Sequence, residues 1–274
     1  AAPTPGLWRM ASRRSPGPES VAGLLDLVAA FRFVGSMTEK KAPDSSIAAF
    51  PDRLTEGYRA FLGHRFTREK LRYEELAKEG QSPRIMIIGC CDSRVSPEVI
   101  FDAAPGELFV MRNVANLVPP YSPDEGLHGA SAALEFAVQA LKVEHIVVLG
   151  HGRCGGIRAF ADDGAAPLSP GDFIGKWVSL LADAAERTGG RGDGETLPVY
   201  VERLALAGIE QSLVNLRSFP CVRILEEKGR LGLHGAYFDV ATGVLMKLDP
   251  GTGRFVPAVA KMPKLVSMIR AVGD

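Results

Sequence analysis

Residues Ile85–Arg94 read IMIIGCCDSR, so a short apolar run leads directly into a cluster of ionisable side chains. A continuous apolar run of this length is typical of a strand that is covered on both faces of a parallel sheet. Leu108–Met111 and Ile146–Leu149 are similar runs, and Gly129–Leu141 between them has the apolar spacing of a helix. Strands that alternate with helices predict an α/β fold with a mostly parallel central sheet flanked by helices.

The segments around this core complete the predicted domain. Residues 53–79 carry apolar and aromatic side chains at helical spacing, which predicts an amphipathic N-terminal helical arm. Phe173–Arg187 and Val201–Arg217 have helical patterns. Leu233–Asp249 reads as a hairpin with Thr242 and Gly243 in its turn, which predicts an antiparallel edge of the sheet. We expect residues 53–274 to form one domain.

The first 36 residues differ in character from the rest, because prolines interrupt any periodicity and arginines outnumber the acids. Met37 opens a polar stretch that resembles a natural amino terminus, so we interpret residues 1–36 as a non-native or disordered leader and residues 37–52 as a linker. A transit peptide is the alternative for an Arg-rich start. The apolar stretch Val21–Val34 is too short to cross a bilayer.

Composition narrows the class of protein. Lys plus Arg number 32 and Asp plus Glu number 32, so no basic stripe indicates a nucleic-acid or anionic membrane partner. The four cysteines occur without a secretory signal pattern, which favours metal binding over disulfides. We therefore expect a reducing, cytoplasmic location and a small-molecule substrate.

Two motifs that follow predicted strands offer metal ligands. Cys90 ends the first run, and the sequence HGRCGG places His151 and Cys154 after the third. Ligands gather at the carboxyl ends of parallel strands, and three protein ligands leave one position of tetrahedral zinc open for water. Because sulfur donates more electron density than nitrogen, we expect activity to rise on the alkaline side. The alternative is that Cys90 is a small core residue and His151 a loop histidine.

Asp92 and Arg94 flank Ser93, so their side chains fall on one side of a turning segment. A forked guanidinium can hold a carboxylate by two bonds. Beside a zinc ligand, Asp92 either closes the fourth metal position or is held off by Arg94 and accepts the proton of zinc-bound hydroxide. The alternative interpretation is a structural ion pair that caps the loop.

The combination Cys90-x-Asp92-Ser93-Arg94 followed by His151-x-x-Cys154-Gly155-Gly156 resembles the β-class carbonic anhydrases. The segment Arg112–Asn116 between the motifs adds to the resemblance, which runs from about Leu54 to Leu248. Three stretches resemble the plant-type branch in particular, namely Glu79–Pro83, Val118–Tyr121 and Gly235–Asp239.

The resemblance implies zinc-dependent, reversible hydration of carbon dioxide to bicarbonate and a proton. It implies one Zn²⁺ per subunit on Cys90, His151 and Cys154, with Asp92 and Arg94 as the catalytic pair. It also implies that a partner subunit offers Gln81 to the substrate, so that the active form is a homodimer or a dimer-based oligomer. The remaining residues assigned to the substrate pocket are Phe109, Val114, Gly155 and Phe136, and Phe136 takes a place where the plant branch often has tyrosine.

Two other functions stay open at this point. A related zinc hydrolase acts on carbonyl sulfide or carbon disulfide with the same metal chemistry. A non-catalytic zinc scaffold has Asp92 permanently in the fourth position. Some bacterial members hold an inhibitory bicarbonate with a tryptophan three residues before the first ligand cysteine, and Ile87 stands there. We therefore expect the open form, with water on zinc near neutral pH.

Overall fold

The computed structural model describes residues 49–124, 126–162, 166–168 and 170–259, and the chain divides into two compact units, residues 1–61 and 62–274. In the first unit the described residues form helix α2 (Asp52–Phe61). The second unit begins with η3 (Leu62–Phe66) and α3 (Thr67–Glu79). The predicted helical character of residues 53–79 is thus confirmed. The leader 1–36 and most of the linker 37–52 lie outside the described residues, and the extent of the domain stays a prediction.

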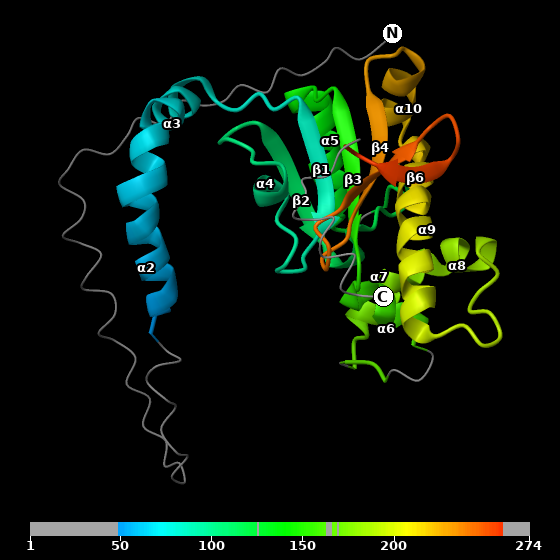
Figure 1. Ribbon diagram of the computed structural model, residues 1–274. Coiled ribbons are helices and arrows are strands. Elements are labelled where there is room, and N and C mark those ends of the chain that lie inside the picture. The colour runs from blue at the N-terminus through cyan, green and yellow to red at the C-terminus, as the bar shows by residue number, and fades with distance from the viewer. Residues whose placement is uncertain (1–48, 125, 163–165, 169, 260–274) are drawn as a thin grey trace, which may run out of the picture. The chain divides into compact units, whose positions relative to one another are not determined.

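The second unit is built on a six-stranded sheet with strand order β2-β1-β3-β4-β5-β6 (Figure 1). The strands are β1 (Ile85–Cys90), β2 (Leu108–Asn113), β3 (His145–His151), β4 (Gly232–Phe238), β5 (Leu245–Asp249) and β6 (Arg254–Pro257). The first four pair in parallel, and β4–β5 and β5–β6 are antiparallel. The predicted α/β fold and antiparallel edge are confirmed, whereas β6 was not predicted.

Helices fill the connections between the four parallel strands. They are α4 (Pro97–Ile100), η4 (Val114–Asn116), α5 (Gly129–Glu135), η5 (Phe136–Leu141), α6 (Gly155–Ala161), α7 (Phe173–Val178), η6 (Ser179–Leu181), α8 (Ala182–Arg187), α9 (Leu197–Ser218) and α10 (Pro220–Glu227). The segment predicted as one helix over 173–187 is divided by the 3₁₀ turn η6. Helix α9 starts at Leu197 rather than Val201, because Pro198 fits the first turn, where its missing N–H costs nothing.

The described residues form three apolar clusters, and the sheet separates two of them because successive side chains of a strand point to opposite faces. Met86 and Ile88 of β1 pack with α5, α9 and α10, whereas Ile87 packs on the other face with Leu149 of β3. Cys90 has the same parity as Met86 and Ile88, so it points to the face that α9 covers. Among the described residues, the structure contains no helix that is both long and apolar enough for a membrane span.

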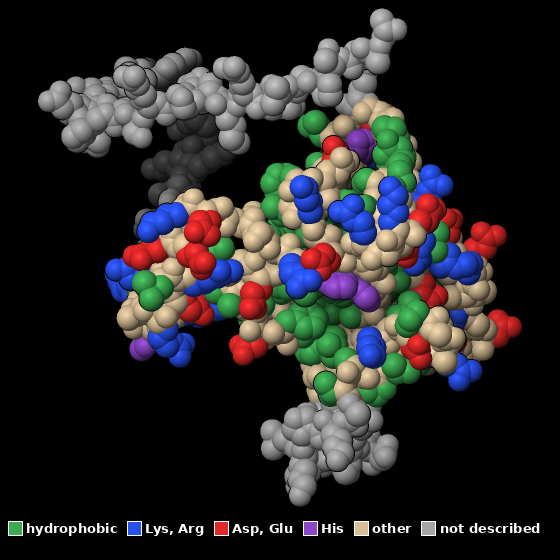
Figure 2. Space-filling model, turned by 90° about the horizontal axis from the view of Figure 1, so that it is seen from above, with side chains coloured by type: hydrophobic (Ala, Val, Ile, Leu, Met, Phe, Trp, Pro, Cys, Tyr) green, Lys and Arg blue, Asp and Glu red, His purple; other side chains and the backbone are tan. Residues whose placement is uncertain are grey.

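The amino ends of β3 and β4 carry a pair of histidines. His145 Nδ1 lies 3.2 Å from His234 Nε2, next to the ion pair of Arg84 and Glu144. Figure 2, which looks onto the end of the sheet where β1 and β3 begin, shows histidine side chains among basic and acidic ones. His145 opens β3 and His234 is level with Val147, so neither histidine lies at the end of the sheet that carries His151.

Candidate metal centre

Three buried side chains meet at the carboxyl ends of β1 and β3. Cys90 is the last residue of β1, His151 is the last residue of β3, and Cys154 lies directly before α6. Their ligand atoms all lie within 4.8 Å of one another, and the two sulfurs are 3.9 Å apart. Neighbouring parallel strands therefore bring together the three residues that the sequence predicted as ligands.

The His151 ring has one nitrogen satisfied and one free for a metal. Nδ1 lies 2.9 Å from the carbonyl oxygen of Gly152, and since a carbonyl only accepts, Nδ1 carries the proton. Nε2 then presents its lone pair. It is buried and lacks a hydrogen-bond partner among the described residues. An unsatisfied buried nitrogen is costly, and a metal ion on Nε2 removes that cost while the carbonyl of Gly152 fixes the ring.

The contact between the two thiols shifts their pKa values in opposite directions. The hydrogen bond with Cys154 lowers the pKa of Cys90 against the opposing effect of burial, and the backbone amides of Asp92 and Ala115 lower it further. The same sulfur contact raises the pKa of Cys154, and burial adds to this rise. One thiolate is therefore present before the second proton leaves. Metal binding has to displace that second proton, because only thiolates ligate.

A left-handed turn presents a backbone amide to the Cys90 sulfur. Ala115 N–H donates to Cys90 Sγ at 3.3 Å, and Ala115 and Asn116 have φ of 65° and 50°. Such backbone is unfavourable for side chains with a Cβ, so contacts must hold it. Asn113 closes the turn with two hydrogen bonds to Leu117, and Trp177 Nε1 donates to the carbonyl of Val114 at 2.8 Å. Trp177, a residue without a predicted role, thus supports the site.

Asp92 and Arg94 form the predicted fork. Arg94 Nε donates to Asp92 Oδ1 at 2.9 Å and Nη2 donates to Oδ2 at 2.7 Å. The Arg94 guanidinium holds the pKa of Asp92 well below its usual range, so the carboxylate stays ionised at neutral pH. Asp92 Oδ2 lies 3.8 Å from His151 Nε2, which places the carboxylate at the border of the ligand cluster.

Arg112 holds the segment that joins the first ligand to this pair. Its Nε donates to the carbonyl of Cys90 at 2.7 Å, and its Nη2 donates to the carbonyls of Asp92 and Val95 at 2.7 and 2.9 Å. Arg112 belongs to the segment Arg112–Asn116 that resembles the family, but no role was predicted for it. The position of Arg112 in the sequence could have indicated this role, because a charged residue directly after the apolar run of a predicted strand has to find polar partners.

The predicted substrate residues do not all lie at the ligand cluster. Val114 packs with the cluster that contains Cys90 and Cys154, and Gly155 opens the helix that follows Cys154. Phe109 pairs with Met86 at the other end of the strands, about 13 Å along the strand from the ligand position, and its ring lies 5.9 Å from that of Phe136. Gln81 is exposed before the start of β1. These assignments stay predictions.

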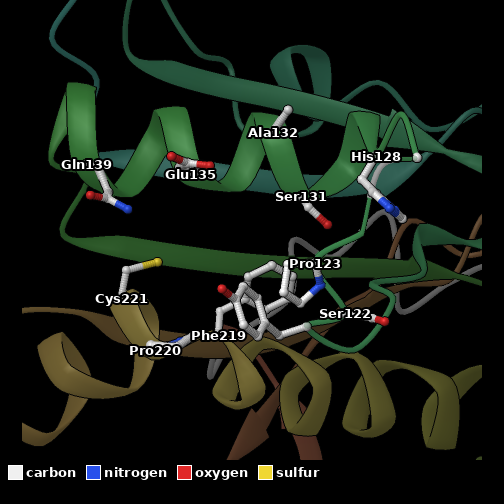
Figure 3. A pocket seen from close by; sticks show the side chains of 12 residues that line it. Ser122, Pro123, His128, Ser131, Ala132, Glu135, Gln139, Phe219, Pro220 and Cys221 are labelled. Atoms are coloured by element: carbon white, nitrogen blue, oxygen red, sulfur yellow. The ribbon is translucent and has the colours of Figure 1, made fainter.

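A separate cavity of about 410 Å³ lies between α5 and α10 (Figure 3). Figure 3 shows Ser131 and Gln139 projecting toward Phe219 and Cys221 across it, and Glu135 also lines it. His128 also lines the cavity, with its Nε2 2.6 Å from Asp124 Oδ1. None of the three ligand residues lines this cavity, so it is not part of the metal centre.

Comparison with known proteins identifies the family. The family model described as carbonic anhydrase matches residues 85–245, which include all three ligands and the Asp92–Arg94 pair. A carbonic anhydrase of Pseudomonas aeruginosa is 36% identical over 220 residues, which is 80% of this chain and 95% of the relative. The chain belongs to the β-carbonic anhydrase family.

Other β-carbonic anhydrases agree with this assignment. Beta carbonic anhydrase 3 of Arabidopsis thaliana is 34% identical over 227 residues, or 81% of this chain and 86% of the relative. A crystal structure of a tetrameric β-carbonic anhydrase from Sordaria macrospora has a TM-score of 0.63 at 27% identity, with 78% of this chain and all of that one covered. The predicted family is confirmed with a plant member among the relatives, and the cluster of two thiols and one imidazole fits the predicted cofactor, Zn²⁺.

Two adjacent glycines provide a matched test of the turn at Ala115 in this β-carbonic anhydrase. A Cβ on Gly156 would lie 2.5 Å from Val114 Cγ1 and 3.0 Å from Ala115 Cβ, so Gly156→Ala must displace the turn that donates to Cys90. We expect about tenfold weaker zinc binding, the scale of effect seen when groups that support metal ligands are disturbed. Competition with a chelator measures this change.

Gly155→Ala is the control, because a Cβ there meets nothing within 4 Å. Both changes add one methyl group to the first turn of α6. Equal zinc affinities of the two variants would show that the turn does not influence the metal centre.

Proposed function

We propose that the chain catalyses zinc-dependent, reversible hydration of carbon dioxide to bicarbonate and a proton. The observation that carries the proposal is the buried Nε2 of His151, which lacks a hydrogen-bond partner among the described residues and lies with two buried thiols in one cluster. Two sulfurs and one nitrogen leave a tetrahedral zinc with one free position, which is the arrangement of a catalytic site. Membership of the β-carbonic anhydrase family supports the reaction.

In this proposal the chain's own residues hold the metal, orient the attacking water and provide apolar surface for the substrate. Cys90, His151 and Cys154 would hold Zn²⁺, which when bound supplies a Lewis acid that lowers the pKa of water. Asp92, ionised and held by Arg94, accepts a hydrogen bond from the attacking water and so turns an oxygen lone pair toward carbon dioxide. Val114 adds apolar surface beside the ligands, which suits an uncharged linear substrate.

We also propose that the active form is a homodimer or a dimer-based oligomer. Within one chain, Gln81 precedes β1 and Phe109 lies at the far end of β2 from the ligands, so a second copy is needed to bring such residues to the site. The Sordaria macrospora proteins are tetrameric, which supports self-association. A cytoplasmic location stays a prediction and is compatible with a site that needs reduced thiols.

Stopped-flow measurement of carbon dioxide hydration from pH 6 to 9 tests the proposed function. We expect a rate enhancement that rises on the alkaline side. The attacking water must lose a proton, and two sulfur ligands make zinc a weaker Lewis acid than an all-histidine site, for which the pKa of that water is about 7. A zinc-loaded protein without any enhancement over this range would refute the proposal. Sulfide release from carbonyl sulfide that is faster than carbon dioxide hydration would favour the alternative hydrolase.

A further inference from the structure

Glu202 of α9 binds the loop between the second and third ligands. This half-buried carboxylate accepts a hydrogen bond from Arg153 N–H at Oε1, 2.7 Å away, and another from the Tyr237 hydroxyl at Oε2. Gly152 leaves room for this approach, because a Cβ there would lie 3.0 Å from the Tyr237 hydroxyl and 3.5 Å from Glu202 Oε2. Glu202 therefore ties α9 and β4 to the loop that carries His151 and Cys154.

The residue that Glu202 holds has an unfavourable backbone conformation. Arg153 has φ of 56°, in the left-handed region that costs a residue with a Cβ about 1 kcal/mol or more. Its side chain is exposed, so packing of that side chain does not impose the conformation. The backbone is held instead on both sides, since Arg153 N–H donates to Glu202 and the Arg153 carbonyl accepts from Arg94 Nη2 at 3.1 Å.

Arg94 connects this loop to Asp92. The same Nη2 that donates to the Arg153 carbonyl also donates to Asp92 Oδ2 at 2.7 Å. Asp92 Oδ2 is the oxygen 3.8 Å from His151 Nε2, the predicted metal-binding nitrogen. A small movement of the Arg153 carbonyl thus breaks one hydrogen bond of Arg94 Nη2, the same group that restrains the Asp92 carboxylate.

We propose that Glu202 is a positioning residue that keeps Asp92 out of the metal coordination sphere. It does so by holding the Arg153 N–H and, with it, the left-handed backbone conformation that presents the Arg153 carbonyl to Arg94. Without Glu202 the backbone of Arg153 relaxes, Arg94 loses its hydrogen bond to the carbonyl, and Asp92 turns toward the metal and occupies the position needed by water. The inference rests on the proposed function of the site, which it deepens by naming what sets the position of the catalytic carboxylate.

The test uses the full chain with Co²⁺ in place of zinc, because the visible spectrum of cobalt reports its ligands. We expect Glu202→Ala to bind Co²⁺ with a changed spectrum and to slow carbon dioxide hydration by the zinc form about tenfold. The spectral change must depend on Asp92. Asp92→Asn and the double variant Asp92→Asn/Glu202→Ala should therefore have the same spectrum as each other.

Three further variants separate positioning from a general structural role. Glu202→Gln keeps an oxygen for Arg153 N–H and should retain the parent spectrum. Glu202→Asp, shortened by one methylene, should give an intermediate spectrum and serves if Glu202→Ala does not fold. Glu210→Ala removes another half-buried glutamate of α9 and should change neither spectrum nor rate.

Two results would overturn the inference. One is a folded, cobalt-loaded Glu202→Ala protein with the parent spectrum. The other is a spectral change that persists when Asp92 is asparagine. Both are read from cobalt spectra, so they are distinct from failure of the parent to hydrate carbon dioxide, which would refute the proposed function instead.

Discussion

Cys154→Ser is expected to abolish zinc binding and carbon dioxide hydration together. The Cys154 sulfur is buried, lies 3.9 Å from that of Cys90, and belongs to the one group of three potential ligands found among the described residues. A serine hydroxyl does not ionise near neutral pH, so it cannot replace the thiolate that balances the charge of zinc. We expect the rate to fall by more than about 100-fold, because loss of a ligand exceeds the 10- to 100-fold effects of the groups around it.

Elemental analysis and stopped-flow kinetics on the same preparations measure this result. Cys91→Ser is the matched control, because Cys91 adjoins a ligand in sequence but is exposed and lies outside the cluster. The control should retain both zinc and activity. A Cys154→Ser protein that keeps one zinc per chain would show that the metal does not depend on this sulfur.

The ligands could be predicted from the sequence because each lies at the end of an apolar run or just after it. Cys90 and His151 end two strands, and parallel pairing of β1 with β3 follows from the alternation of strands and helices. The pairing of Asp92 with Arg94 needs only a turning segment, so it was also predictable. The metal centre could therefore be predicted mainly from the short spacing of the residues within each motif and from the position of the motifs at strand ends.

The supporting roles of Trp177 and Glu202 could not be predicted, because each binds a backbone group far away in the sequence. Trp177 donates to the carbonyl of Val114, 63 residues before it, and Glu202 accepts from the amide of Arg153, 49 residues before it. Both contacts involve turns with left-handed residues that are not glycine, a conformation that the sequence does not reveal. Strand β6 also could not be predicted, because its four residues have no clear strand pattern.

The arrangement of the substrate pocket poses a different problem. Phe109 and Phe136 contact each other in the structure, which agrees with their joint assignment to one apolar surface. Their position away from the ligands of the same chain depends on the length of β2 and its register with β1. The resemblance assigned only Gln81 to the partner subunit and did not say which subunit provides Phe109 or Phe136.

Asp92→Asn is expected to keep zinc and to slow carbon dioxide hydration by about 10²- to 10⁴-fold, the range for loss of a group that handles a proton. Zinc should remain because the ligand atoms come from Cys90, His151 and Cys154. The rate should fall because both carboxylate oxygens accept from Arg94, whereas an amide offers one acceptor and turns an N–H toward the guanidinium or the water.

Asp124→Asn is the control for this change, since it removes a surface carboxylate that pairs with His128 outside the metal centre. We expect it to leave zinc content and rate unchanged. The two measurements on Asp92→Asn distinguish the interpretations of the Asp92–Arg94 pair. An unchanged rate would reduce the pair to a structural cap of the loop. Loss of zinc would make Asp92 a ligand and favour a non-catalytic scaffold. Retained zinc with a slowed reaction is the combination that a positioned, ionised carboxylate beside an open metal site requires.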